Sequence, residues 1–282
     1  MAIVTTAEQQ PGVDLLGESP VRSGSHSVPG TGPTVVRVDP LKVALVLAAI
    51  SLLLAVVGTC TRIAIYQIAP DFGTPGIESP PLARALSRLD LGHEPSLPQL
   101  YSSLLHAVAS GLLVLLALRA RAKGERFAGS WWLLSFVFAM FAIDESVMLH
   151  EMANSVLERV VPAQGILRYP WILAGAGFTV AVAAVLIPFL RNLDRRTRNL
   201  FFLAGGLFVG GAIGVEMIEG IITDTWGETS LPMALAIAVE EGMEMCGMCL
   251  FIYALLAKLR LSSNVIRFEL GQRKLATEGG ER

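Results

Sequence analysis

The segment LPMALAIAVEEGMEMCGMCLFIYALLA, residues 231–257, decides the fold. It holds no Lys or Arg and is long enough to cross a bilayer, which takes about 20 apolar residues in a helix. Three glutamates, Glu240, Glu241 and Glu244, nevertheless interrupt it. One acidic side chain at the centre of a membrane helix costs roughly 2.5–3.5 kcal/mol. The segment therefore predicts a membrane helix that carries part of a polar site.

Five other apolar stretches have a similar length, so the sequence predicts an all-α, polytopic membrane bundle of six helices. The spans are expected at about 41–66, 99–119, 130–152, 170–190, 199–222 and 231–257. The composition agrees, because only 16% of the 282 residues are charged, against about 25% in soluble domains. The net charge of -2 provides no basic field that would indicate a nucleic-acid partner.

The remaining segments divide the chain into a bundle and two tails. Residues 1–38 predict a disordered N-terminal tail, 39–260 the six-span bundle, and 261–282 a cytoplasmic C-terminal tail. Between the first two spans, Leu82, Leu86 and Leu89 recur at i, i+4 and i+7. This pattern predicts an amphipathic helix over 78–92 that lies on the outer membrane interface, or else packs on the bundle.

Basic residues indicate which way the bundle is oriented. Clusters of Lys and Arg lie at 119–126, at 191–198 and after residue 257, whereas the other connecting loops hold two basic residues each at most. Basic loops usually stay in the cytoplasm. We therefore expect a multi-pass protein of the cell (inner) membrane, with its N- and C-termini both cytoplasmic.

Acidic side chains are concentrated in three of the spans, with no basic residue among them. The eight carboxylates are Asp144, Glu145, Glu151, Glu216, Glu219, Glu240, Glu241 and Glu244. Acting independently, they would cost on the order of 20 kcal/mol. With the expected orientation, most fall in the outer half of the bilayer, where His106 of the second span also lies. This common depth predicts one shared site.

Helical spacing supports a shared site. Glu216 and Glu219 stand at i and i+3, hence on one helix face. The three glutamates of the last span fall within an arc of about 100°, and Asp144 and His150 share an arc of about 120° with Glu151. Glu145 turns away from His150, so it is expected either to face a neighbouring helix or to be the one protonated acid of the cluster.

The carboxylates and imidazoles of the predicted site are suited to bind a pair of metal ions. Carboxylate-rich di-iron and di-manganese bundles draw four Glu and two His from four helices, although the Glu-x-x-His spacing of those bundles is absent here. We expect two divalent ions, with iron or manganese as the first choice and zinc as the alternative. The predicted ligands are His150, Glu151, Glu216, Glu219, Glu241 and Glu244, followed by His106 and Asp144. Glu240 and Glu145 are the predicted catalytic or proton-relay groups.

Three functions remain open from the sequence. The first is a di-metal oxidoreductase or hydroxylase that acts on a lipid-soluble substrate. The second is a metal-ion or proton transporter or sensor, because acids inside membranes mark ion pathways. The third is a non-redox acid-base enzyme, such as a cyclase or hydrolase. Expected partners are membrane lipid and a lipid-soluble small molecule or metal ion, and the oligomeric state stays open. Helices broken at mid-span would favour transport.

Three smaller features complete the predictions. Arg62, near the outer end of the first span, is expected either to pair with a carboxylate or to extend toward lipid headgroups. Gly206, Gly210 and Gly214 form a stripe of small residues that predicts close helix packing. Trp171 opens the fourth span and is expected in the aromatic belt at the outer interface.

Overall fold

The computed structural model describes residues 38–72 and 78–262, and every regular element in this part of the chain is helical. Residues 1–37, 73–77 and 263–282 lie outside the described residues. The predicted N-terminal tail, 1–38, and most of the predicted C-terminal tail, 261–282, fall there and stay predictions.

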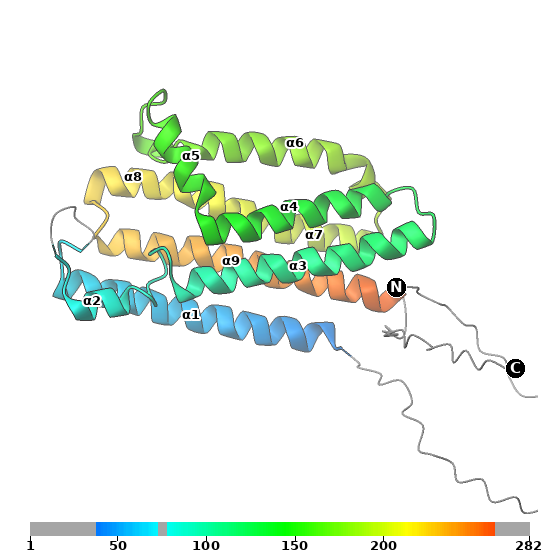
Figure 1. Ribbon diagram of the computed structural model, residues 1–282, viewed down its shortest axis with the longest axis horizontal. Helices are drawn as coiled ribbons and strands as arrows, with labels where there is room; N and C mark the ends of the chain where they lie inside the picture. The colour runs from blue at the N-terminus through cyan, green and yellow to red at the C-terminus, as the bar shows by residue number, and fades with distance from the viewer. Residues whose placement is uncertain (1–37, 73–77, 263–282) are drawn as a thin grey trace, which may run out of the picture. The chain divides into compact units, whose positions relative to one another are not determined.

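Within the described residues, six helical stretches are long and apolar enough to cross a membrane, which confirms the number of predicted spans (Figure 1). They are α1 (Pro40–Ile68), α3 (Leu97–Ala122), α4 (Ala128–Val147), α6 (Trp171–Asn192), the continuous stretch Arg195–Trp226, and α9 (Leu231–Ser262). The arrangement is that of a multi-pass membrane protein. Its orientation and the identity of the membrane remain predictions.

Local sequence explains where several of these helices begin. The Asp39 carboxylate accepts a hydrogen bond from the amide of Leu41 at 3.0 Å, and Pro40 occupies the first helical position of α1. Ser96 caps α3 in the same way, and Asp194 accepts from the amide of Thr197 at 2.9 Å to cap the helix that follows. Each cap satisfies an amide that the helix itself leaves without a partner.

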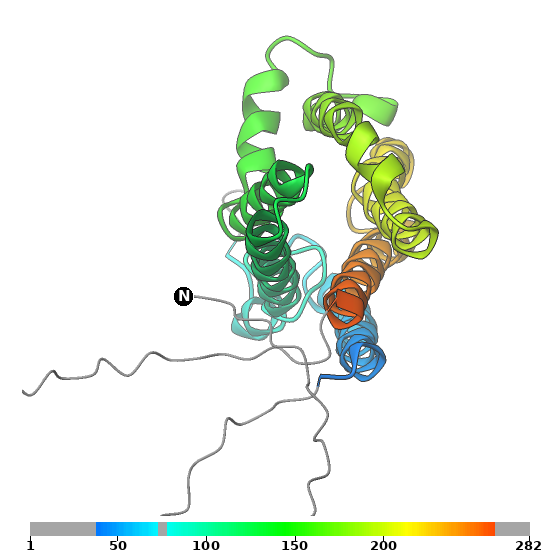
Figure 2. The same cartoon turned by 90° about the vertical axis from the view of Figure 1, so that its right-hand side faces the viewer.

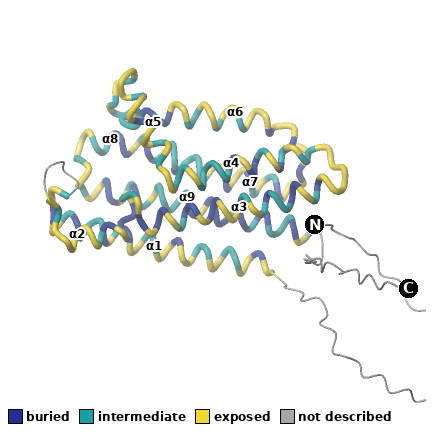
Figure 3. Tube along the Cα trace, viewed as in Figure 1, coloured by how far each residue is buried: buried dark blue, intermediate teal, exposed yellow. Residues whose placement is uncertain are grey.

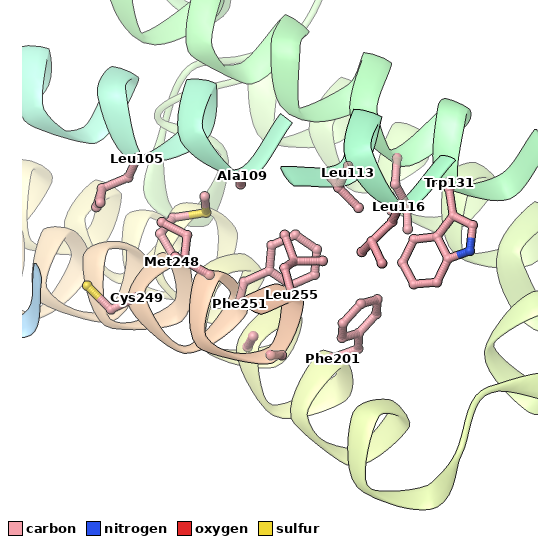
Figure 4. Packing of buried hydrophobic residues seen from close by; sticks show 14 of the residues in the cluster. Leu105, Ala109, Leu113, Leu116, Trp131, Phe201, Met248, Cys249, Phe251 and Leu255 are labelled. Atoms are coloured by element: carbon pink, nitrogen blue, oxygen red, sulfur yellow. The ribbon is translucent and has the colours of Figure 1, made fainter. Parts of the chain in front are cut away.

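The helices form two groups around a common core. Helices α3 and α4 pair closely on one side, and α9 lies beside α1 on the other, as both views show (Figures 1 and 2). Leu113, Trp131, Phe201 and Leu255 pack between the two groups (Figure 4). In the most apolar part of α9, 50% of the residues are buried, against 11% in that of α1. Figure 3 shows the same contrast, with more exposed residues along α1 than along α9. Helix α9 is therefore central, and α1 presents an apolar surface suited to lipid.

Glycines permit a close approach between α9 and the preceding helix, and of the three predicted positions only Gly210 takes part, since a Cβ there would lie 3.0 Å from Met243 Cε of α9. A Cβ added at Gly211 would lie 2.9 Å from a backbone oxygen of α9, and one at Gly247 would lie 2.9 Å from a backbone oxygen of α7 (Arg195–Val209). A Cβ at Gly206 or Gly214 would meet no neighbouring atom within 4 Å. The predicted packing role was therefore wrong for these two glycines, because they point away from the contact.

Two membrane helices are interrupted. The expected span 130–152 ends at Val147, Met148 adopts a left-handed conformation (φ 58°), and α5 (Leu149–Leu157) continues in a new direction. The Asp144 carboxylate supports this turn by accepting a hydrogen bond from the amide of His150 at 2.9 Å. The stretch Arg195–Trp226 contains a π-helical segment, η2 (Gly210–Val215), between α7 and α8 (Glu216–Trp226). Both irregularities lie next to predicted site residues.

The loop between α1 and α3 packs on the bundle. Its helix, α2 (Pro81–Leu86), is shorter than the expected 78–92. Ala83 is fully buried in a small cluster with Ile65 of α1, whereas Leu82 is exposed. This geometry corresponds to the packed alternative. The short helix η1 (Gly165–Leu167) lies against α8.

Candidate functional site

A cavity of about 510 Å³ lies between α4, α5, α6, α8 and α9, toward the end of the bundle that carries α2 and α5 (Figure 1). All eight acids of the predicted spans contribute to its lining, and so does His150. The structure thus brings together carboxylates that are up to 100 residues apart in the chain, from Asp144 to Glu244. Whether they bind a metal stays a prediction.

Two further acids, Glu94 and Glu228, join the lining, which makes ten carboxylates among its residues. Both lie in loops, and Glu94 stands two residues after Gly92, just before α3. Burial is the main reason that the pKa of Glu94 is raised above its ordinary value. Sequence reasoning missed both residues, because a loop acid has no unusual hydropathy to mark it.

Asp144 and His150 form a pair across the turn at Met148. His150 Nδ1 lies 3.1 Å from Asp144 Oδ2, and the His150 amide donates to Asp144 Oδ1. Burial opposes the charged imidazole, but the hydrogen bond and charge of Asp144 outweigh it and raise the pKa of His150 to about 9. The pairing leaves Nε2 as the ring nitrogen available to a ligand, with Glu151 Oε1 3.9 Å away. A carboxylate that orients a histidine in this way is typical of metal sites.

Trp171 connects three helices at the cavity. Its Nε1 donates a 2.7 Å hydrogen bond to Glu216 Oε1 on α8, and its backbone amide donates to Asn154 on α5. Its ring centroid lies 5.3 Å from that of His150. The sequence indicated only a residue at the membrane interface. A hydrogen bond to Glu216, 45 positions away in the chain, leaves no local sequence pattern.

Glu219 has an unsatisfied oxygen. The residue is 4% exposed, and its Oε1 has no hydrogen-bond partner in the part of the chain that the structure describes. Its carboxyl group interacts directly with that of Glu240 on α9. A buried polar atom without a partner is unfavourable by about 1–3 kcal/mol, so this position is suited to a ligand that supplies a positive charge or a donor.

Arg62 is the only Arg or Lys among the residues that line the cavity. Its guanidinium lies 3.2 Å from the carboxylate of Asp90, which is buried in the loop before α3. Of the two sequence alternatives, the structure therefore favours pairing over extension to lipid headgroups. The partner is a loop acid and not one of the eight acids of the spans.

Glu145 and His106 lie side by side, yet only Glu145 reaches the cavity. Ser102 Oγ donates to Glu145 Oε1 at 3.0 Å, and His106 Nδ1 lies 3.0 Å from the backbone oxygen of Ser102. His106 is fully buried, with its ring against Phe141 and Phe208. The structure thus separates His106 from the other predicted ligands, because depth along a helix does not determine which way a side chain points.

The lining also has an apolar part. Phe141 of α4, Phe178 of α6 and Phe208 of α7 all contribute to it. Phe141 contacts both of the others, with ring centroids 6.1 Å from Phe178 and 5.5 Å from Phe208. These three rings, called here the aromatic floor, form a continuous surface suited to an apolar molecule.

The carboxylates surround the cavity and do not converge on one point. Within residues 38–72 and 78–262, no three His, Cys, Asp or Glu side chains come close enough together to hold a metal ion. The predicted ligands Glu241 and Glu244 nevertheless lie within range of each other's charge and of Glu145. Side chains would have to move to bring several oxygens onto one ion.

Comparison with protein families places the chain in one of them. The model of a family described as a domain of unknown function, DUF8692, matches residues 44–259, which include nearly all of the six apolar helices. The chain therefore belongs to this family. No curated protein and no solved structure shows significant similarity to it.

Proposed function

We propose that this member of the DUF8692 family is a metal-dependent membrane oxidoreductase or hydroxylase that acts on a lipid-soluble molecule. The observation that carries the proposal is the meeting of eight membrane acids and His150 in one cavity. Two divalent ions, iron or manganese, would supply four positive charges and offset much of the unfavourable burial of these groups.

The residues divide into three roles. His150, Glu151, Glu216, Glu219, Glu241 and Glu244 are the proposed metal ligands. Asp144 orients His150 through the 3.1 Å contact to Nδ1, so its role is support and not ligation. Glu240 and Glu145 are placed to hold or move a proton, because both line the cavity and each carboxyl group interacts with a polar neighbour, Glu219 for Glu240 and Ser102 for Glu145.

The size and the walls of the cavity favour an organic substrate. Small-molecule sites usually enclose about 300–1,000 Å³ and combine apolar walls with a few polar groups. A cavity of about 510 Å³ exceeds what two ions need, and the aromatic floor gives the remaining space an apolar surface. A molecule that partitions into the bilayer would be held there beside the acids.

Metal analysis of the full chain in lipid nanodiscs tests the proposal. We expect near-stoichiometric iron or manganese in the wild type and a large loss in Glu216→Gln and Glu244→Gln. Glu125→Gln is the matched control, because Glu125 lies outside this cavity in the loop between α3 and α4. Equal trace metal in all four proteins would refute the metal centre. Stoichiometric zinc or calcium would refute the redox chemistry but not the site.

Cation transport is the second candidate, and the two interrupted helices favour it. Transporters often bind ions where membrane helices are broken, and here the left-handed Met148 and the π-helical η2 both adjoin the cavity. Manganese flux into proteoliposomes that is lost in Glu241→Gln would support transport. Tight metal binding without flux would support the enzyme.

A further inference from the structure

The charges of the cavity favour a cationic guest. Ten carboxylates line it, whereas the Arg62 guanidinium is already paired with Asp90 and His150 with Asp144. When these carboxylates are ionised, two divalent ions still leave the lining with an excess of negative charge. Beside ionised carboxylates, a positively charged group is favoured over a neutral or anionic one.

Glu219 marks where a positive group would bind. Its Oε1 is buried without a partner in the described chain, it lines the cavity, and it interacts with Glu240. An ammonium group is a compact charge with several N–H donors, so it could satisfy both carboxylates at once. The other proposed ligands would remain available to metal ions.

The aromatic floor lies on one side of this acidic layer. Phe141 precedes Asp144 by three residues, which is about 4.5 Å along α4, and Phe208 precedes Glu216 by eight, about 12 Å along its helix. Phe178 follows Trp171 by seven residues on an antiparallel helix. Relative to Asp144, Glu216 and Trp171, all three rings are thus displaced toward the middle of the bundle. A guest would meet Glu219 at one end and the aromatic rings at the other.

From this arrangement we infer that the substrate is a lipophilic amine, bound as an ammonium ion by Glu219 and Glu240 with its apolar body on the aromatic floor. The inference rests on the proposed function, since it names the substrate class of the same cavity. It assigns Glu219 to the substrate in preference to the metal, and Glu240 to the substrate in preference to proton transfer.

A matched pair of probes tests the inference. Binding of 4-phenylbutylamine and of 4-phenylbutanol to the full chain in phosphatidylcholine nanodiscs is measured by titration calorimetry, with empty nanodiscs subtracted. The two probes share an apolar body and differ in charge. We expect the amine to bind at least tenfold more tightly than the alcohol, and Glu219→Gln to remove most of that difference. Phe178→Ala should weaken both probes.

Metal content measured on the same samples separates the two proposals. Equal affinity for amine and alcohol in metal-loaded protein would overturn the substrate class and leave the metal centre intact. Amine selectivity in a protein without stoichiometric metal would overturn the metal centre alone. If Glu219→Gln does not fold, as judged by thermal melting, Glu240→Gln replaces it. Selectivity that persists in a folded variant at either position overturns the inference.

Discussion

Replacement of Trp171 by Phe tests whether the cavity is organised as a metal site. Trp171 Nε1 donates to Glu216 Oε1 at 2.7 Å, and Glu216 is only 9% exposed. Phe keeps an aromatic ring beside His150 but removes the donor. Glu216 then loses its hydrogen bond and becomes free to turn away from the arrangement in which it faces the cavity.

The expected magnitude follows from that hydrogen bond. A hydrogen bond to a charged group contributes about 1.5–3 kcal/mol, and every 1.4 kcal/mol changes an equilibrium constant about tenfold. Loss of a residue that orients a metal ligand typically lowers metal affinity by about 10–100-fold. The two figures agree, so Trp171→Phe should weaken manganese binding by about 10–100-fold.

The assay is a manganese titration of metal-stripped protein in nanodiscs, followed by calorimetry. Trp226→Phe is the control, because Trp226 is 61% exposed and does not line the cavity. We expect the control to bind manganese as the wild type does. Unchanged affinity in Trp171→Phe, or an equal loss in both variants, would refute the assignment of Glu216 as a ligand held by Trp171.

Other substitutions test the packing, the histidine pair and a helix cap. Gly211→Ala places a Cβ 2.9 Å from a backbone oxygen and should lower the free energy of unfolding by about 1–3 kcal/mol. Gly214→Ala meets no neighbour and should raise the free energy of unfolding by up to about 1 kcal/mol. Equal effects of the two substitutions in a denaturation series would contradict the assigned contact. Asp144→Asn should lower manganese affinity about tenfold in the same titration, because His150 loses its orienting carboxylate; wild-type affinity would exclude that role. Asp194→Ala removes a cap and should be destabilising by about 1 kcal/mol at neutral pH. Burial by itself would raise the pKa of Asp194, but the Lys258 ammonium and the Thr197 amide outweigh it and hold this pKa below its ordinary value. The carboxylate therefore stabilises the fold above about pH 4, and this contribution disappears as the pH falls through the lowered pKa. Thermal melting should show wild type and variant converging in acid, and a constant difference would argue against the cap.

Much of the architecture could be predicted because hydropathy and helical period are local properties. Six apolar stretches became six long helices, and the acids on them met in one cavity. The break at Met148 could not be predicted, since its left-handed turn depends on a carboxylate one turn earlier accepting the His150 amide. The packing role of Gly206 and Gly214 was misassigned because small residues mark a potential contact but do not specify the neighbour.

The residues of the candidate site likewise include some that the sequence identifies and some that it does not. His106 lies at the right depth but faces Phe141 and Phe208, whereas the loop residues Glu94 and Glu228 reach the cavity without any signal in the sequence.

The sequence by itself determined that acids lie within membrane helices, because each unfavourable charge is visible against its apolar surroundings. Only the tertiary structure decided which groups share the cavity and which partners they have, such as Trp171 for Glu216 and Asp144 for His150. The physical reason is that a hydrogen bond depends on distance and direction in space, and these follow from how whole helices pack against one another.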